Sequence, residues 1–319
     1  MEKFKIKKFR ELGVFSVLIV MVIVLSIVSP VFLKPVNLVN IIRQTVEIGV
    51  MAVGMTFLII AGEMDLSVGS VFGATAMLSA LMFRNAVSPT LVFTVSLLVG
   101  GATGFLNGFL VTKTKMPAFI ATLGTMQIFR SVAYGISGGE SISVFPEYAL
   151  NSWVFKMGGS VGKVPVQIFI MVVLFLVAGV ILAKTQFGFN VYATGGNKRA
   201  AKLIGINTDR TKIICFVFSG ILCALAGLIS IAYLQSVPTT AGNGREMDVI
   251  AAVILGGAAL SGGRGTILGT LIGAIIMSVI KNGMVLLSVP VFWQSGFIGV
   301  IIILAVLLDT WMKRKEQNE

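Results

Sequence analysis

Residues 195–205 read Gly195-Gly196-Asn197-Lys198-Arg199-Ala200-Ala201-Lys202-Leu203-Ile204-Gly205, a short polar island between two long apolar segments. The island has the residues expected at the two ends of a small helix, because Asn197 can cap the first free N–H groups and Gly205 can adopt the left-handed conformation that ends a helix. The flanking apolar segments, residues 165–183 and 213–234, are each long enough to cross a bilayer. The stretch therefore predicts a rigid basic helix in a loop between two membrane spans.

The composition is that of an integral membrane protein. Hydrophobic residues make up 56% of the 319 residues and charged residues 12%, against roughly 25% charged residues in soluble domains. The net charge of +12 does not indicate nucleic-acid binding, because the basic residues flank apolar segments, as the positive-inside rule requires. Histidine is lacking and both cysteines fall in one apolar segment, so we expect no metal site, no disulfide and no cofactor.

The hydropathy pattern predicts an all-α membrane protein with about ten transmembrane segments in a single domain, residues 1–319. The segments are residues 14–33, 47–62, 66–83, 89–112, 117–136, 165–183, 213–234, 249–262, 266–288 and 291–310. The third and the eighth are shorter than the roughly 20 residues that a straight span needs, so we expect these two to be broken or partly re-entrant. The first has a basic leader but lacks a cleavage site, which favours a retained anchor.

The basic residues predict the orientation of the chain. If the N-terminus is cytoplasmic, ten crossings place residues 113–115, the loop 184–212 and the C-terminus on the cytoplasmic side. All three are basic, and the loop 184–212 holds six Lys or Arg against one Asp. We therefore expect a multi-pass protein of a bacterial or archaeal cell membrane with both termini in the cytoplasm.

Three short features recur in the same order five segments later. The pairs are Glu63-Met64-Asp65 with Glu246-Met247-Asp248, Asn107-Gly108 with Asn282-Gly283, and Met116-Pro117-Ala118-Phe119 with Val289-Pro290-Val291-Phe292. A shift by an odd number of segments reverses the direction in which the chain enters the membrane. The pattern therefore predicts an inverted-topology repeat, typical of transporters, of segments 2 to 5 (about residues 36–136) with segments 7 to 10 (about residues 206–310).

Four stretches together carry a family resemblance. They are Gly62-Glu63-Met64-Asp65-Leu66-Ser67-Val68-Gly69-Ser70, Pro117-Ala118-Phe119-Ile120-Ala121-Thr122-Leu123-Gly124-Thr125-Met126, the island at 195–205, and Leu255-Gly256-Gly257-Ala258-Ala259-Leu260-Ser261-Gly262-Gly263-Arg264-Gly265. Over about residues 14–310 the chain resembles the permease subunits of monosaccharide ABC importers, with the ribose permease group most similar. The resemblance implies a permease that pairs with a second permease copy, identical or related. It also implies two cytoplasmic ATP-binding subunits and an extracytoplasmic sugar-binding protein as partners.

The island also resembles the coupling loop of ABC importers. Its Ala200-Ala201-x-x-x-Gly205 pattern matches the core of that loop, whereas Arg199 stands where the wider motif has Glu. The resemblance implies that the cytoplasmic coupling loop is residues 184–212 and that Asn197, Arg199, Ala200, Ala201 and Gly205 dock the ATPase.

The chain lacks the means to hydrolyse ATP itself. It has no G-x-x-x-x-G-K-[ST] phosphate loop, and its nearest Gly-Lys pair, Gly162-Lys163, is followed by Val164. Energy must then come from a partner ATPase, and the chain is not itself an enzyme. The alternative is a secondary carrier or channel for a small polar solute, but such a carrier would keep ionisable groups at mid-membrane depth, whereas the acids here cluster at segment ends. A second alternative is an ABC permease for a related solute, such as a furanose autoinducer or a branched-chain amino acid.

Several polar residues are candidates for the transport pathway. Asp65 and Asp248 stand directly before apolar segments, where a carboxylate can cap a helix, and a gating role is the other interpretation. The uncharged polar residues Asn107, Gln127 and Asn282 lie within apolar segments. They suit a pathway for a neutral polyol, and hydrogen bonding between helices explains them equally well.

Two further features concern charged residues and the longest external loop. Arg130 lies within the fifth segment, where we expect it to reach a membrane face or to pair with a carboxylate such as Glu140. Residues 138–163 form the longest predicted external loop, which mixes both charge signs and carries Trp153 and Phe155. This composition favours a docking surface for the soluble binding protein, and a disordered linker is the alternative.

Overall fold

The computed structural model describes the backbone of residues 2–318 and the side chains of residues 14–304, 306 and 307. The predicted basic leader at residues 3–10 and the cluster Lys313-Arg314-Lys315 lie outside the residues whose side chains are described. The elements in chain order are α1 (Glu2–Val28), α2 (Pro35–Ile60), α3 (Val68–Arg84), α4 (Pro89–Lys113), α5 (Ala118–Ser137), α6 (Glu147–Leu150), α7 (Trp153–Lys156), β1 (Ser160–Val161), β2 (Val164–Pro165), α8 (Val166–Lys184), α9 (Gln186–Gly196), α10 (Lys198–Leu203), α11 (Thr208–Leu234), α12 (Arg245–Leu255), α13 (Ile267–Leu286) and α14 (Val291–Asn318).

Each predicted apolar segment overlaps a helix. Among the described residues, five helices are long and apolar enough to cross a membrane: α2, α4, α8, α11 and α13. The shorter apolar helices are Val14–Val28 within α1, α3, and Val291–Leu304 within α14. The protein is therefore a helical bundle with several membrane-crossing helices.

The predicted start of the second segment is wrong. Helix α2 begins at Pro35, not at residue 47, because polar side chains in its first turns find partners inside the bundle. Asn37 forms hydrogen bonds with Asn282 at 2.7 and 3.0 Å, and the Arg43 guanidinium lies 4.2 Å from the centre of the Tyr233 ring. The longer helix places the buried residue Glu47 in its middle, so Glu47 is an exception to the expected clustering of acids at segment ends.

The eighth predicted segment is broken. Helix α12 has 11 residues, which at 1.5 Å per residue is about 16 Å, far short of a hydrocarbon core of about 30 Å. The chain before it, residues 235–244, runs without a helix beside α3, and an added Cβ at Gly73 would lie 2.2 Å from the Ala241 carbonyl oxygen. Non-helical backbone of this kind is tolerated in membrane proteins only where other protein segments or a cavity surround it.

Helix α11 is the centre of the bundle and packs on α2, α3 and α4. The contact with α4 is close, since a Cβ added to Gly104 would lie 2.2 Å from the Phe216 carbonyl oxygen. The helix contacts show what we call an exchange pattern, in which α2, α3, α4 and α5 correspond to α11, α12, α13 and α14. Helix α11 packs on α4 and α3, and correspondingly α2 packs on α13 and α12. Helix α3 packs on α4 and α5, and correspondingly α12 packs on α13 and α14.

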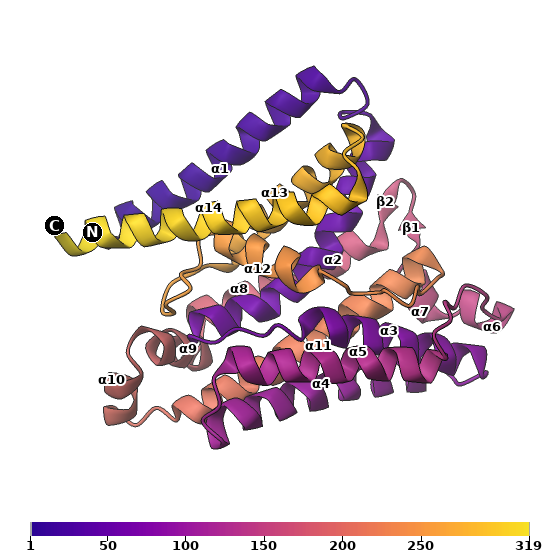
Figure 1. Ribbon diagram of the computed structural model, residues 1–319, viewed down its shortest axis with the longest axis horizontal. Coiled ribbons are helices and arrows are strands. Elements are labelled where there is room, and N and C mark those ends of the chain that lie inside the picture. Colours follow the sequence, from indigo (N-terminus) through magenta and orange to yellow (C-terminus); the bar gives the residue numbers. More distant parts are fainter. Residues whose placement is uncertain (1, 319) are drawn as a thin grey trace.

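The two ends of the bundle differ in what they carry. Figure 1 shows the start of α1, the end of α14 and the short helix α10 at one end, which we call the α10 end. The opposite end, which we call the hairpin end, carries α6, α7 and the antiparallel pair β1–β2. Residues 138–163, which include α6, α7 and β1, are folded against the bundle. Ile142 forms a β-bridge with Val237, and the Tyr148 hydroxyl donates to the Phe83 carbonyl oxygen at 2.7 Å.

Candidate functional site

The island at 195–205 has the helix that its sequence predicts. Asn197 caps α10, with its Oδ1 accepting the Ala200 N–H at 3.0 Å. The chain leaves the helix through Gly205, whose φ of +85° lies in the left-handed region that glycine adopts without strain. The Gly205 N–H then donates to the Lys202 carbonyl and the Ile206 N–H to the Ala201 carbonyl, so the free carbonyl groups at the end of the helix are used.

The side chains of α10 divide into an inner and an outer set. Ala201 is buried, with 2% of its surface exposed, and packs toward the bundle. Leu203 and Ile204 are 88% and 67% exposed, beside the exposed side chains of Lys198, Arg199 and Lys202. The sequence pattern did not predict the role of these two apolar residues. Their exposure could have been predicted, because they form an apolar pair on a short basic helix that has too few apolar neighbours to bury them.

The helix α9 that carries α10 is fixed to the rest of the bundle through a close backbone contact and a side-chain hydrogen bond. A Cβ added to Gly195 would lie 1.8 Å from the Ile60 carbonyl oxygen at the end of α2. The same carbonyl accepts the Gly263 N–H at 2.8 Å, from the loop 256–266 between α12 and α13. The Tyr192 hydroxyl of α9 donates to the Gly265 carbonyl oxygen of that loop at 2.8 Å.

The first turn of α12 forms ion pairs with three different helices. The Arg245 guanidinium bonds to the Glu47 carboxylate of α2 at 2.5 Å, and the Ser230 hydroxyl donates to the other Glu47 oxygen at 3.0 Å. The Lys281 ammonium of α13 bonds to the Asp248 carboxylate at 2.5 Å. Asp248 also lies near the N-terminus of α12, where its negative charge complements the helix dipole.

The third ion pair of this turn is looser. Arg130 of α5 lies 3.8 Å from Glu246, not beside Glu140 as the sequence analysis expected. Neither the Arg130 Nη2 nor the Glu246 Oε2 has a hydrogen-bond partner, although both atoms are buried. Glu246 is therefore a buried carboxylate whose hydrogen bonds are only partly made.

Asp65 is the centre of a second polar cluster, between α2, α3 and α4. Its Oδ1 accepts the Ser67 backbone N–H at 2.8 Å and the Ser67 hydroxyl at 2.6 Å, just before α3 begins. The Asn107 amide of α4 donates to the Ser67 hydroxyl at 2.8 Å and lies 3.5 Å from both Asp65 oxygens. Burial raises the pKa of Asp65, and these hydrogen bonds oppose the rise. In the same loop, Glu63 forms an ion pair with Lys212 at the start of α11.

The other two predicted pathway residues lie elsewhere. Asn282 of α13 is buried and exchanges two hydrogen bonds with Asn37 of α2. Gln127 is exposed on α5. The fold therefore does not bring Asn107, Gln127 and Asn282 together within one copy of the chain.

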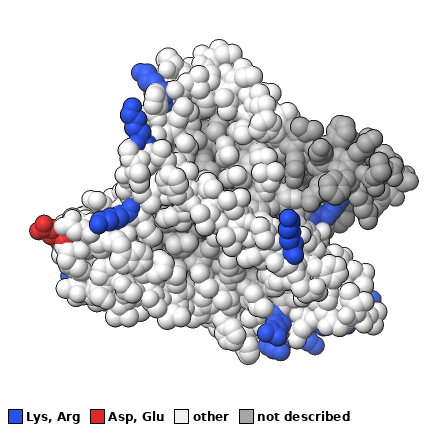
Figure 2. All heavy atoms as spheres, turned by 180° about the vertical axis from the view of Figure 1, so that it is seen from behind, with Lys and Arg blue, Asp and Glu red and all other residues white. Residues whose placement is uncertain are grey.

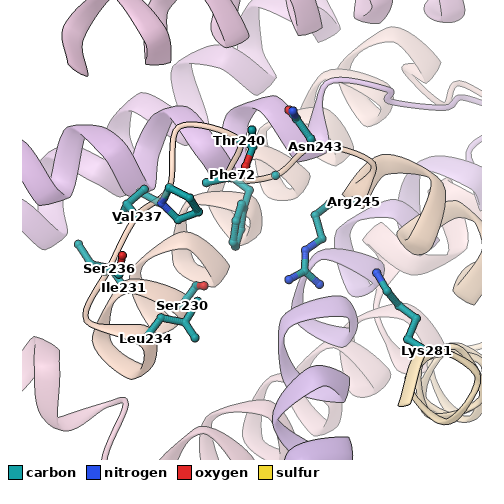
Figure 3. Close-up of a pocket in the computed structure, with 14 residues that line it drawn as sticks. Phe72, Ser230, Ile231, Leu234, Ser236, Val237, Thr240, Asn243, Arg245 and Lys281 are labelled. Carbon is teal, nitrogen blue, oxygen red and sulfur yellow. The ribbon is translucent and has the colours of Figure 1, made fainter. Parts of the chain in front are cut away.

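A cleft of about 300 Å³ lies between α3, α11, α12 and α13. Its lining residues are Phe72, Ala76, Ser230, Ile231, Leu234, Ser236, Val237, Pro238, Thr240, Ala241, Gly242, Asn243, Arg245 and Lys281. Figure 3 shows Arg245 and Lys281 along one side, with the end of α11 and the loop 235–244 on the other. Glu47, Arg245 and Lys281 could not be predicted from the sequence, because their pairing joins residues far apart in the chain.

The surface away from these clusters carries few charges. Figure 2 shows one face on which most described residues are uncharged and the Lys and Arg side chains stand in small separate groups. Many large apolar side chains of α8 are exposed, among them Val173, Leu176 and Val180. Such a surface is that of a helix facing lipid or another membrane helix.

Comparisons with known proteins give a consistent result. A family model described as branched-chain amino acid transport system / permease component matches residues 37–306. The chain is 43% identical over 301 residues to the ribose import permease protein of Bacillus subtilis (strain 168), covering 94% of this chain and 92% of that protein. It is 42% identical over 294 residues to the ribose import permease protein of Escherichia coli (strain K12), covering 92% and 91%.

A solved structure has a similar fold. It is described as an inward-facing conformation of a putative metal-chelate type ABC transporter, and it superposes with a TM-score of 0.53. The match covers 93% of this chain and 99% of that chain at 18% sequence identity. At this identity the likeness concerns the fold alone.

The ion pair between Glu47 and Arg245 yields a first prediction. Glu47→Gln leaves the Arg245 charge partly buried without its partner, which costs about 3 kcal/mol when a buried pair is broken on one side. Thermal unfolding of the detergent-purified protein should therefore shift to lower temperature. The double variant Glu47→Gln/Arg245→Gln should recover most of the loss. Equal stability of the single and double variants would contradict the assigned pairing.

The contact at Gly195 yields a second prediction. Gly195→Ala places a methyl group against the Ile60 backbone, which cannot move aside as a side chain can, so overpacking should cost about 1–3 kcal/mol. The neighbouring Gly196→Ala is the matched control, since its Cβ would lie 3.9 Å from the nearest atom. Melting temperatures of both variants in detergent test this, and an equal effect at the two positions would argue against the close contact.

Proposed function

This chain belongs to the family described as branched-chain amino acid transport system / permease component, and on that premise we propose that it moves a ribose-like monosaccharide into the cell as the membrane permease subunit of an ATP-driven importer. The observation that carries the proposal is the identity of 42–43% to two ribose import permeases over more than nine tenths of each chain. Chains this similar share their fold, and the superposed ABC transporter has that fold. The chain is a multi-pass membrane protein and a transport subunit, with ATP hydrolysis supplied by its partner.

A monosaccharide is favoured over a branched-chain amino acid although the family description names the latter. The two relatives described above are named for ribose import. The chemistry of the buried polar groups agrees, because the carboxylates of Glu47 and Asp248 already have cationic partners and the Asp65 carboxylate is directed at Ser67. A related neutral solute such as a furanose autoinducer is the alternative substrate.

We propose α10 as the docking helix for the cytoplasmic ATP-binding subunits. Leu203 and Ile204 are apolar side chains without cover, and the basic residues around them suit an acidic rim on a partner. Asn197 and Gly205 hold the helix in shape, Ala201 seats it on the bundle, and Arg199 and Ala200 lie on its exposed side. The contacts of Gly195, Ile60 and Gly263 would then transmit movement between the ATPase and the membrane helices.

This docking role implies an orientation. With α10 in the cytoplasm, both chain ends lie on the cytoplasmic side, because all three are at the same end of the bundle (Figure 1). The hairpin end then faces the binding protein outside the cell. The basic loop 184–212 supports this orientation through the positive-inside rule.

We also propose that residues 36–136 and 206–310 form an inverted repeat. The exchange pattern of packing supports it, because α2, α3 and α4 meet α11, α12 and α13 in equivalent pairs. The repeated acidic motif supports it less directly, since Asp65 precedes α3 in a loop whereas Asp248 lies inside the first turn of α12. For a transporter, such a repeat lets a site between the halves open to either side at similar cost.

The pathway residues keep different roles in this proposal. The hydrogen bonds of Asn107 and Asn282 favour the joining of helices. Asp65 stabilises the turn before α3 by accepting the Ser67 N–H, but it caps no N–H of the helix itself. Gln127 is exposed on α5, where it would line a passage if a second permease copy packs against that helix. Whether the second copy is identical or a related permease, the passage would lie between the two.

The docking role of α10 yields a third prediction. Leu203→Asp puts a charge into the proposed apolar contact without disturbing the bundle, so capture of the ATP-binding subunit should weaken about tenfold, equivalent to roughly 1.4 kcal/mol. Val161→Asp, at a 67% exposed apolar position on the hairpin end, is the matched control and should leave capture unchanged. Pull-down of the ATPase from detergent extracts measures both. Normal capture and normal ATPase stimulation with Leu203→Asp would exclude α10 as the docking helix.

The hairpin end yields a fourth prediction. Glu140 and Glu147 are exposed in the segment 138–163, so Glu140→Lys/Glu147→Lys should weaken stimulation of ATP hydrolysis by the sugar-binding protein. The loss should be larger at low ionic strength, because salt screens exposed charges. Basal hydrolysis by the same complex is the internal control. Unchanged stimulation at low salt would place the binding-protein contact elsewhere.

A further inference from the structure

We propose that the cleft between α3, α11, α12 and α13 is a binding subsite for a neutral polyol of pentose size, present within each copy of the permease. The inference rests on the proposed function and adds to it a place where the sugar pauses inside one chain. It is separate from any passage that forms between two copies.

The size of the cleft suits a small ligand. Its volume of about 300 Å³ is at the lower limit of small-molecule sites, which range over about 300–1,000 Å³. A pentose is among the smaller ligands of this range. The cleft is formed by the C-terminal end of α11, the non-helical residues 235–244 and the start of α12.

The charges of the cleft select against an anion. Arg245 and Lys281 line it, but each is already neutralised by a carboxylate behind it, Glu47 and Asp248. A guanidinium has five N–H donors and an ammonium three, so both groups keep donors beyond those directed at their carboxylates. The cleft thus offers charged hydrogen-bond donors with little net charge, which suits the hydroxyl groups of an uncharged sugar.

The remaining walls complete this chemistry. Thr240 and Asn243 supply hydroxyl and amide groups that can accept as well as donate hydrogen bonds, and the Ser230 hydroxyl, which donates to Glu47, can still accept one. Phe72 forms an aromatic wall beside Arg245, whose guanidinium lies 6.0 Å from the centre of the ring. A few polar groups directed into an apolar and aromatic pocket are the usual composition of a small-molecule site.

The position of the cleft fits delivery from the hairpin end. Its lining residue Val237 is bridged to Ile142 of the segment 138–163. Figure 3 shows Thr240 and Asn243 on the loop above Phe72 and Arg245. A sugar released at the hairpin end would meet this loop before it reached the ion pairs of α12.

Two neighbouring residues give a matched test. Thr240 lines the cleft and Thr239 does not, and the native residues Cys215 and Cys223 are buried, so they react little with a polar reagent. The Thr240→Cys and Thr239→Cys variants, each assembled with the ATPase in lipid nanodiscs, are labelled with a polar maleimide at increasing D-ribose. At a ribose concentration of about twice the dissociation constant, labelling of Thr240→Cys should slow about threefold, because the free fraction falls as 1/(1 + [L]/Kd).

The controls separate this inference from the proposed function. Thr239→Cys should label at the same rate with and without D-ribose, and ribose 5-phosphate should not protect Thr240→Cys. Protection by the phosphate in place of the sugar, equal effects at both positions, or no protection in a complex that imports ribose would each overturn the subsite. A wild-type complex that neither imports ribose nor couples to an ATPase would instead overturn the proposed function.

Discussion

The first turn of α12 holds charged groups inside an apolar bundle, and the arrangement of the surrounding helices depends on how those charges are paired. Arg245, Glu246 and Asp248 meet Glu47 of α2, Arg130 of α5 and Lys281 of α13. A buried charge without a partner costs several kcal/mol, so these pairs fix the position of α12 against three helices at once. They also hold the non-helical residues 235–244 in place, because this stretch runs directly into the first turn of α12. The cleft exists because this chain crosses part of the bundle without forming a helix.

The same helix connects the interior to the α10 end. Its C-terminal side continues into the loop 256–266, which contacts the end of α2 and the end of α9 through Gly263 and Gly265. These contacts involve backbone atoms and so have little freedom to adjust. A displacement of α10 by a bound ATPase would therefore reach α2 and the loop after α12 together. The first turn of α12, which carries the ion pairs, is separated from that loop only by the rest of this short helix.

The sequence predicted the fold well where the signal was local or repeated. Apolar runs located the helices, the caps Asn197 and Gly205 located α10, and the short eighth segment indicated a broken span. The sequence did not predict features that depend on tertiary contacts. Polar residues such as Asn37 and Arg43 resemble a loop until Asn282 and Tyr233 are placed beside them. Glu47, Arg245 and Lys281 could not be joined into a site from spacing, since their contacts cross up to 198 residues of chain.

The buried ion pairs raise the question of whether ATP or an ion gradient drives transport, because a gradient-driven carrier also uses ionisable groups inside its bundle. Here the carboxylates around α12 are paired with opposite charges, and Asp65 is hydrogen-bonded to Ser67 and Asn107, which favours a structural role and an external ATPase. The deciding measurement is uptake of labelled D-ribose by proteoliposomes, comparing ATP with an imposed proton or sodium gradient. Uptake should require ATP, the ATP-binding subunit and the sugar-binding protein together, and a gradient should not replace them. Ribose uptake driven by a gradient in liposomes that contain this chain alone would contradict its assignment as an ABC importer permease.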